Sequence, residues 1–239
     1  MPKPSVVILA GGLGTRIRHL LDGQPKPLAP VAGKPFLEWV IRYYARQGLD
    51  NFILSAGYRS DLIEEFCRSL NLPGLRVRCV AEPSPLGTAG GFCHAATTGS
   101  SESWLVCNGD SLVCADLAAF LTLGADDPED ARLLALKVTD ASRYGNLAVD
   151  ERGLLTSFNE KAPGCGLINA GVYLLRSRLL ARFPSQRPLS FETDVFPMLL
   201  KENARIRVAE VAAPFIDIGT ESSLREAEAF IIQNQEHFI

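Results

Sequence analysis

Residues 5–16 read Ser5-Val6-Val7-Ile8-Leu9-Ala10-Gly11-Gly12-Leu13-Gly14-Thr15-Arg16, so an apolar run passes directly into a glycine-rich segment. The unbroken run predicts a buried β-strand over 6–10, and it is too short for the core of a signal peptide or for a membrane span. Three glycines within four positions let backbone N–H groups come close to a ligand, and clustered N–H groups bind anions. The stretch therefore predicts a buried strand that ends in an anion-binding loop.

Two common phosphate-binding patterns do not fit this loop. No Gly-Lys-Ser/Thr follows, as a Walker A loop requires, and Arg16 stands near the place where a dinucleotide-binding fingerprint has its third glycine. Arg16 instead offers a fixed fork of donors for phosphate oxygens. Ten residues later, Lys26 lies between two prolines that stiffen the chain. A structural turn and a solvated surface lysine are the alternatives to a phosphate site here.

The rest of the chain predicts an α/β protein. Up to residue 138, apolar runs alternate with helical periods, which favours a mostly parallel sheet with helices on both faces. We expect strands at 52–56, 75–81, 103–107 and 132–138, a helix whose first turn contains Pro35, and helices at 62–70, 88–97 and 116–123. The second part is richer in strands, and no linker separates it from the first, so we expect a single domain over 1–239.

Several elements are expected in this second part. A hairpin is predicted at 147–158 with a glycine in its turn, followed by a strand at 168–175 and helical segments at 177–183 and 191–202. Strands at 205–212 and 214–218 come next. They lead to a final helix that begins near Glu221 with Thr220 as its N-cap.

Composition excludes several classes of protein. The chain is 47% apolar and 21% charged with a net charge of −3, and it has neither a basic run for nucleic acid nor a block of like charge. Its six cysteines show no C-x-x-C spacing and its three histidines are scattered, so reduced core cysteines are expected rather than zinc ligands or disulfides. We expect a cytoplasmic protein that binds neither nucleic acid nor membrane.

Three segments, Gly11–Arg16, Pro25–Leu28 and Pro30–Phe36, together resemble the sugar-1-phosphate nucleotidyltransferases. The resemblance implies a nucleotide-diphospho-sugar transferase fold, which is glycosyltransferase-A-like and has a Rossmann-like, mostly parallel mixed sheet. It implies a nucleotide-binding part at 1–138, and a sugar-binding lobe with closing helices at 139–239. The residues implied to act on the nucleotide are catalytic Arg16 and Lys26 and the binding residues Leu9, Gly11, Gly12, Gly14 and Thr15.

Two aspartates are candidate metal ligands. Asp110 follows an apolar strand, and ligands of open parallel sheets bind beyond the carboxyl ends of the strands. An acid there suits Mg²⁺ bound to triphosphate oxygens, although a turn or cap aspartate is the alternative. Asp217 lies between two isoleucines, where a carboxylate needs a cation or hydrogen-bond donors. The resemblance implies that both hold Mg²⁺, so the fold must bring them together.

The resemblance also assigns residues to the sugar. It implies that Glu160 accepts hydrogen bonds from sugar hydroxyls and that Lys161 contacts the sugar phosphate as a catalytic residue. An exposed ion pair or turn is the alternative for these two. The further sugar-side residues that the resemblance implies are Asn108, Tyr144, Gly145, Asn169 and Gly171.

The segment Glu82–Gly91 resembles the family's base-binding segment. Gly87, Thr88 and Gly90 are expected to permit close approach and to open the following helix. Glu82 is the informative residue, because a carboxylate only accepts hydrogen bonds and guanine offers two adjacent donors, N1–H and N2–H₂. Uracil and thymine offer one donor between acceptors. Glu82 therefore favours GTP if it reaches the base, and a solvated position at the rim of the pocket is the alternative.

Within the family, Leu86–Gly90 looks most like the guanylyltransferases of mannose 1-phosphate. The segment Gly166–Leu175 narrows the resemblance to those of D-glycero-α-D-manno-heptose 1-phosphate. We expect transfer of a nucleoside monophosphate from GTP to the heptose 1-phosphate, with release of pyrophosphate, for surface polysaccharide or glycoconjugate synthesis. Mannose 1-phosphate as acceptor and uridylyl or thymidylyl transfer are the alternatives.

Two other classes of protein are alternatives to a nucleotidyltransferase. Whether the chain forms a homodimer is left open by the sequence. A regulatory sugar-nucleotide-binding paralogue is expected to lose Arg16, Lys26 or Asp110, and all three are present. A nicotinamide-dependent oxidoreductase lacks its ribose-binding acid, because Ser55–Gly57 closes the second strand.

Overall fold

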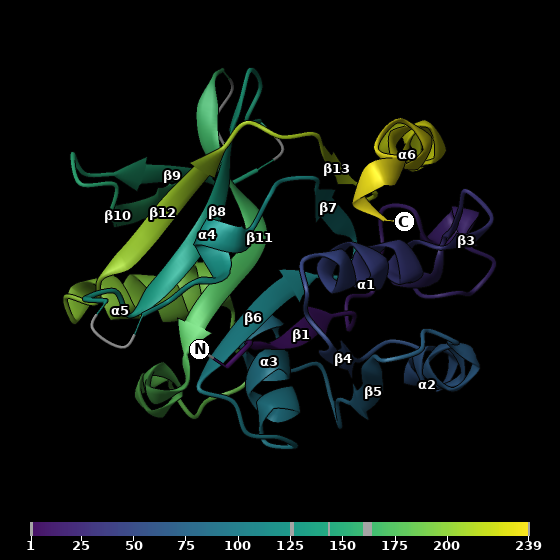
Figure 1. Cartoon of the computed structure of the whole chain (residues 1–239), viewed down its shortest axis with the longest axis horizontal. Coiled ribbons are helices and arrows are strands. Elements are labelled where there is room, and N and C mark those ends of the chain that lie inside the picture. Colours follow the sequence, from purple (N-terminus) through teal and green to yellow (C-terminus); the bar gives the residue numbers. More distant parts are fainter. Residues whose placement is uncertain (1, 125–126, 143, 160–163, 239) are drawn as a thin grey trace.

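The computed structural model describes residues 2–124, 127–142, 144–159 and 164–238. Its main feature is a nine-stranded mixed sheet in the order β10-β9-β11-β6-β1-β4-β5, with β8 paired to β11 and β12 (Figure 1). The strands are β1 (Ser5–Leu9), β4 (Asn51–Ala56), β5 (Arg76–Ala81), β6 (Ser103–Asn108), β8 (Ala131–Val138), β9 (Asn146–Val149), β10 (Leu155–Asn159), β11 (Gly166–Arg176) and β12 (Ile206–Val211). Each predicted strand is present, with ends that differ by at most two residues.

Helices cover both faces of the sheet, as predicted (Figure 1). One face carries α1 (Phe36–Arg46), α2 (Ser60–Ser69) and α6 (Glu221–Gln233), and the other carries α3 (Thr88–Ala96) and α5 (Phe196–Lys201). Successive side chains of a strand point to opposite faces, so Ile8 of β1 joins the first core and Val7 joins the second. The apolar run that opened the sequence is thus buried on both sides.

The four strands β6, β1, β4 and β5 are mutually parallel, and the rest of the sheet differs from them. The eleven-residue β11 pairs antiparallel with both β6 and β8, so it lies between them. The strand at 131–138 therefore does not extend the parallel series directly, although its pairing with β12 is parallel. Because the four strands are parallel, their carboxyl ends meet at one edge of the sheet.

Some local elements differ from the sequence prediction. The helix predicted at 191–202 is a π-turn at Phe191–Val195 followed by the shorter α5, since Pro197 has no N–H to donate and suits a first turn only. The segment Ser177–Arg182 is a 3₁₀ helix, and α4 (Ala118–Leu121) has only four residues. Pro35 is the N-cap of α1 and not part of its first turn.

Several short elements were not predicted from the sequence. They are β2 (Pro30–Val31), β3 (Lys34–Pro35), β7 (Ser111–Val113) and the 3₁₀ helices Arg18–Leu20, Lys26–Leu28 and Gln235–His237. The strand β13 (Phe215–Asp217), which was predicted, pairs antiparallel with β7. Elements of two or three residues are too short to show a periodicity in the sequence. Whether they form depends on the segments with which they pair.

The N-terminus of α6 confirms its predicted cap. The Thr220 hydroxyl accepts a hydrogen bond from the Ser223 N–H at 3.3 Å, and the Ser223 hydroxyl accepts from the Thr220 N–H at 3.2 Å. This reciprocal capping satisfies two N–H groups that the helix itself cannot pair. Among the cysteines, Cys107 and Cys114 are buried as expected, whereas Cys165 is exposed.

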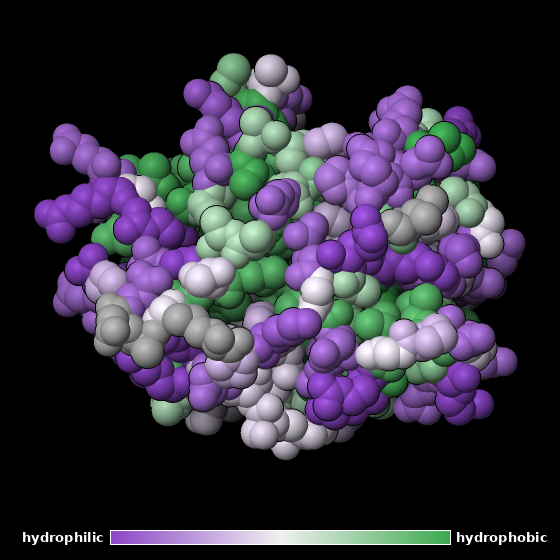
Figure 2. All heavy atoms as spheres, in the orientation of Figure 1, coloured by the Kyte–Doolittle hydropathy of each residue, from purple (hydrophilic) through white to green (hydrophobic). Residues whose placement is uncertain are grey.

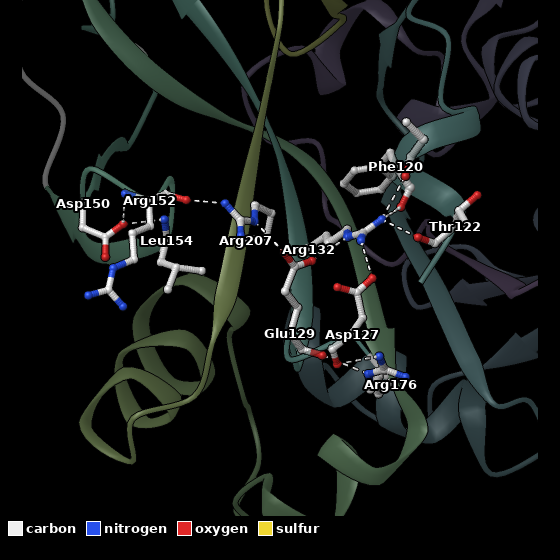
Figure 3. Close-up of polar contacts among 11 residues, drawn as sticks. Phe120, Thr122, Asp127, Glu129, Arg132, Asp150, Arg152, Leu154, Arg176 and Arg207 are labelled. Atoms are coloured by element: carbon white, nitrogen blue, oxygen red, sulfur yellow. Dashed lines mark hydrogen bonds and ion pairs between the residues drawn. The ribbon is translucent and has the colours of Figure 1, made fainter. Parts of the chain in front are cut away.

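The buried carboxylate of Glu129, just before β8, stabilises the part of the sheet formed by β8 and β12 (Figure 3). Glu129 accepts from Arg132 Nε at 2.7 Å and from Arg207 Nε at 2.5 Å, and its side chain is only 6% exposed. Arg207 also donates to the Arg152 carbonyl in the turn of the β9–β10 hairpin. Burial on its own raises the pKa of Glu129, but the two arginines outweigh burial and lower it. Glu129 thus ties β8, β12 and the hairpin together.

In the part of the chain that the structure describes, the large apolar side chains with high exposure are Leu13, Leu20, Val149 and Ile232. Figure 2 shows hydrophilic side chains over most of one face, with apolar ones gathered toward its middle. Among the described residues, no helix is long and apolar enough to cross a membrane.

Candidate active site

A cavity of about 370 Å³ lies at the edge where the carboxyl ends of the parallel strands meet. It is bounded by the segments that follow β1 and β5 and by the end of β6. Its lining residues are Leu9, Gly11, Gly12, Leu13, Glu82, Pro85, Leu86, Gly87, Thr88, Asn108 and Asp110. Predicted nucleotide-side, sugar-side and metal-binding residues from three separate parts of the sequence are therefore brought together.

A smaller cavity of about 140 Å³ contains the remaining part of the glycine-rich loop. Its lining residues are Gly14, Thr15, Arg16, Ile17, Lys26 and Gly219. Two cations, Arg16 and Lys26, thus lie in one small recess beside backbone N–H groups. This arrangement suits a ligand that carries several negative charges.

Lys26 is held firmly. It begins a short 3₁₀ helix, Pro25 and Pro27 on either side of it are buried, and its side chain is only 11% exposed. Its ammonium group forms an ion pair with Asp110. The buried prolines restrict the backbone on both sides of Lys26, and a carboxylate from the end of β6 contacts its ammonium group.

The pairing of β7 with β13 brings the two aspartates close in space. Asp217 is in register with Ser111, and the Ile218 N–H donates to the Asp110 carbonyl at 3.0 Å. A Cβ added to Gly219 would lie 2.8 Å from Asp217 Oδ1 and 3.1 Å from Arg16 Nη2, so this carboxylate and guanidinium both lie against Gly219. Two carboxylates flanked by two cations form a donor set that fits a hard divalent cation bound to phosphate.

The loop after β1 depends on a neighbouring loop that the sequence analysis did not assign to the site. The Tyr58 N–H donates to the Gly11 carbonyl at 3.3 Å, and Arg59 Nη1 donates to the Gly23 carbonyl at 3.1 Å. A Cβ on Gly57 would lie 2.7 Å from the Gly11 carbonyl oxygen, so only glycine lets the two loops meet. The signal in the sequence that could have indicated this contact is Gly57, a glycine directly after a strand, where another backbone can approach closely.

Glu82 lies inside the cavity wall and is half-buried. Its Oε1 accepts from the Ser55 hydroxyl at 3.0 Å, and its Oε2 accepts from the Leu86 N–H at 3.1 Å. The carboxylate is packed so closely that a Cβ on Gly11 would lie 2.6 Å from Oε1. Glu82 is thus anchored within the wall, which is not the arrangement of a solvated residue at the rim.

The glycines after Glu82 admit protein backbone and side chain, which the sequence analysis did not foresee. A Cβ on Gly87, where φ is +77°, would lie 2.5 Å from the Leu189 carbonyl oxygen. That carbonyl accepts from the N–H groups of Ala89 and Gly90 at the start of α3, at 2.9 and 3.1 Å. The segment around Leu189 therefore caps the N-terminus of α3. Gly87 and Thr88, at the same end of the helix, line the cavity.

The predicted sugar-side residues lie on and beside β11. Gly171 has φ of +70°, and a Cβ there would lie 2.2 Å from Asn108 Nδ2, so the bulge in β11 makes room for the Asn108 side chain. Asn169 Oδ1 accepts from the Gly171 N–H at 2.9 Å. Tyr144, just before Gly145 and β9, stacks edge-on against Phe215 with ring centroids 5.8 Å apart. Glu160 and Lys161 lie outside the described residues.

The fold and this site define a class of protein. The family model for nucleotidyl transferases matches residues 5–234, and the chain belongs to the nucleotidyl transferase family. The sheet with helices on both faces is that of nucleotide-diphospho-sugar transferases, and the family assignment makes the protein a nucleotidyltransferase enzyme.

Particular relatives are similar along most of the chain. It is 38% identical over 215 residues to D-glycero-alpha-D-manno-heptose 1-phosphate guanylyltransferase from Campylobacter jejuni, with 89% of this chain and 93% of that protein covered. It is 34% identical over 230 residues to mannose-1-phosphate guanylyltransferase from Mycobacterium tuberculosis, covering 95% of this chain but only 64% of that protein. The crystal structure of HddC from Yersinia pseudotuberculosis with GMP-PN is 33% identical with a TM-score of 0.83, covering 95% of this chain and 98% of HddC.

Proposed function

We propose that this protein is a guanylyltransferase that transfers GMP from GTP to a sugar 1-phosphate, with D-glycero-α-D-manno-heptose 1-phosphate as its preferred acceptor. The observation that carries the proposal is the anchored Glu82 carboxylate in the wall of the same cavity as Asp110. The heptose enzyme from Campylobacter jejuni and the complex of HddC with GMP-PN support both halves of the proposal.

The chemistry is an in-line displacement at the α-phosphorus. An oxygen of the sugar phosphate forms the new P–O bond, and the bond to the β-phosphate oxygen breaks, so pyrophosphate leaves with the electron pair. The attacking phosphate is already an anion at neutral pH, so the reaction requires no general base. The task of the protein is to hold two polyanions in line against their repulsion.

Each charged side chain of the site has a role in this task. Arg16 and the N–H groups of the loop after β1 bind the triphosphate and stabilise the leaving pyrophosphate. Lys26, held by Asp110, neutralises charge that builds up at the α-phosphate. Lys161 is assigned to the incoming sugar phosphate by family resemblance, and that role stays a prediction.

Asp110 and Asp217 would hold Mg²⁺. The β7–β13 pairing joins the backbones beside these carboxylates, and Mg²⁺ favours one or two carboxylates together with phosphate oxygens. When bound, Mg²⁺ supplies Lewis-acid stabilisation of charge on the phosphate oxygens. Asp110 then also positions Lys26, because its carboxylate contacts that ammonium group.

A matrix of substrates tests the proposal. The purified protein is incubated with Mg²⁺, one of ATP, CTP, GTP, UTP or dTTP, and the 1-phosphate of heptose, mannose, glucose or N-acetylglucosamine, and pyrophosphate release is followed. GTP with the heptose 1-phosphate is expected to give the highest kcat/KM. Highest activity with UTP or dTTP would show that the base assignment is wrong, and no pyrophosphate with any pair would remove the enzymatic function.

Mannose 1-phosphate is the second candidate acceptor. The 34% identical relative from Mycobacterium tuberculosis is named a mannose-1-phosphate guanylyltransferase. Mannose and the heptose share the stereochemistry of the ring and differ in the extension at C6. The ratio of the two kcat/KM values in the same matrix decides between the two acceptors.

A further inference from the structure

A line of hydrogen bonds connects the two sides of the cavity through a residue that does not line it. Asn169 Nδ2 donates to the Tyr173 hydroxyl at 2.7 Å, and that hydroxyl donates to Glu192 Oε1 at 3.0 Å. On the other side of the same carboxylate, the Thr88 hydroxyl donates to Glu192 Oε2 at 3.2 Å. The line runs from β11 through the π-turn before α5 to the first residue of α3.

Glu192 determines the direction of every bond in this line. A carboxylate that receives hydrogen bonds from Tyr173 and Thr88 acts only as an acceptor, so the phenol must point its single proton at Glu192. Burial first, and then the charge of Glu192, raise the pKa of Tyr173 well above 10, so the phenol keeps that proton. The phenol oxygen can then only accept from Asn169, which leaves the Asn169 amide oxygen to accept the Gly171 N–H.

Both ends of the line reach the walls of the cavity. Thr88 lines the cavity directly. At the other end, Asn169 holds Gly171, and Gly171 provides the space for the Asn108 side chain, which also lines the cavity. One carboxylate outside the cavity therefore acts on a nucleotide-side wall residue and on a sugar-side wall residue.

Several contacts hold the turn that carries Glu192 without using its carboxylate, although the Ser190 hydroxyl also donates to Glu192 Oε2 at 2.8 Å. The Leu189 N–H donates to the Leu86 carbonyl at 2.8 Å, and the side chain of Phe191 is fully buried. The Ser190 N–H donates to Asp194 Oδ2 at 2.7 Å, and the Ser190 hydroxyl accepts from N–H groups of the turn. The contacts of Leu189, Phe191 and the Ser190 N–H do not use the charge of Glu192, so they remain when that charge is removed.

We propose that Glu192 is a positioning residue that couples the two substrate subsites, by orienting Thr88 on the nucleotide side and, through Tyr173 and Asn169, the Gly171–Asn108 contact on the sugar side. The inference rests on the proposed function for the identity of the two substrates. Glu192 is not among the residues that line the cavity, so its loss is expected to act on binding of both substrates and little on the chemical step.

Glu192→Gln tests the coupling. Its amide group presents donors on one side. Either the Tyr173 hydroxyl therefore loses its acceptor, or the Thr88 and Ser190 hydroxyls, which share Oε2, lose theirs. We expect the KM values for GTP and for the sugar 1-phosphate to rise by about tenfold each, equivalent to about 1.4 kcal/mol of binding free energy, with kcat changed by less than about threefold. An unchanged pair of KM values, or a loss confined to kcat, would overturn the proposal.

Asp194→Asn is the matched control. Asp194 lies on the same turn, and its carboxylate accepts the Ser190 N–H and contributes no bond to the line between the subsites. Both KM values are expected to stay within about twofold of the wild-type values, with thermal unfolding midpoints similar in the two variants. Equal KM increases in Asp194→Asn and Glu192→Gln would mean that the turn acts only as a support, which overturns the proposal.

A second measurement does not depend on turnover. The side-chain amide resonances of Asn169 in a ¹⁵N-labelled protein report its bond to Tyr173, and they are expected to shift in Glu192→Gln but not in Asp194→Asn. Unshifted resonances in Glu192→Gln overturn the inference even if the wild-type enzyme is active. If the wild-type protein transfers no nucleotide, the proposed function fails, and the Asn169 resonances still decide the role of Glu192.

Discussion

Glu82→Gln is expected to lower the preference of the enzyme for GTP while leaving the protein folded. Glutamine can keep both internal contacts of Glu82, because its carbonyl oxygen can accept the Leu86 N–H and its NH₂ group can donate to the Ser55 hydroxyl. The change therefore alters which hydrogen-bonding groups face the base.

The magnitude follows from counting acceptors. Each carboxylate oxygen of Glu82 receives one internal hydrogen bond and retains one further lone-pair direction, so two acceptors remain for the two adjacent donors of guanine. Glutamine leaves one acceptor and opposes the second guanine donor with its own N–H. A bidentate base contact is worth roughly 1–3 kcal/mol of discrimination, which corresponds to about a 5- to 150-fold loss in kcat/KM for GTP.

The assay is pyrophosphate release with GTP, UTP and dTTP at a fixed concentration of the best sugar 1-phosphate. The ratio of kcat/KM for GTP to that for UTP is expected to fall by the factor given above, and the circular dichroism spectrum to stay unchanged. Ser55→Ala is the control, because it removes an anchoring hydroxyl and keeps both carboxylate oxygens. If the ratio of kcat/KM for GTP to that for UTP is the same in wild type and Glu82→Gln, the hypothesis that Glu82 contacts the base is refuted.

Three further outcomes are expected. Asp110→Asn and Lys26→Ala should each reduce turnover by orders of magnitude, because each breaks the ion pair at the α-phosphate site; near-normal turnover in either variant would remove that residue from the mechanism. Gly171→Ala should raise the KM for the sugar 1-phosphate more than that for GTP, because its φ of +70° is strained for alanine and the added Cβ would lie 2.2 Å from Asn108 Nδ2; a selective rise in the KM for GTP would contradict this. Glu129→Gln should lower the free energy of unfolding at pH 7 by about 2–4 kcal/mol in chemical denaturation, between the costs of breaking exposed and buried ion pairs. Because the folded pKa of Glu129 is lowered, its stabilisation is present above the unfolded pKa of about 4.3 and is lost as the pH falls below that, so the difference between wild type and Glu129→Gln should narrow in acid.

The part of the fold that could be predicted from sequence is the part with strong local signals. The apolar run of β1 must lie between two covered faces, and its burial on both sides agrees with this. Thr220 before a helical period predicted the start of α6 correctly because an N-cap acts within three residues of itself. Apolar periods and helix caps depend on residues that are close together in the chain, so they can be recognised from the sequence alone.

The features that the sequence did not predict depend on partners far away in the chain. β7 has only three residues, and it is a strand because β13 pairs with it across about a hundred positions. The glycines after Glu82 were expected to permit close approach of a ligand. Gly87 does line the cavity, but the contact of Gly87 with the Leu189 backbone was not predicted. A glycine in the sequence indicates that another group approaches the backbone closely. Which group approaches depends on a long-range contact that the sequence does not show.

The sequence by itself therefore determined the class of site: a glycine-rich loop after a buried strand, with Arg16, Lys26 and an acid at the end of another strand, specifies which charges are available for phosphate. Tertiary structure alone decided how those charges meet. The ion pair of Lys26 with Asp110, the approach of Asp217 through β13, and the line from Thr88 to Asn169 through Glu192 all join distant segments. The physical reason is that hydrogen bonds and ion pairs act over a few ångströms of space, whatever the number of residues between the partners.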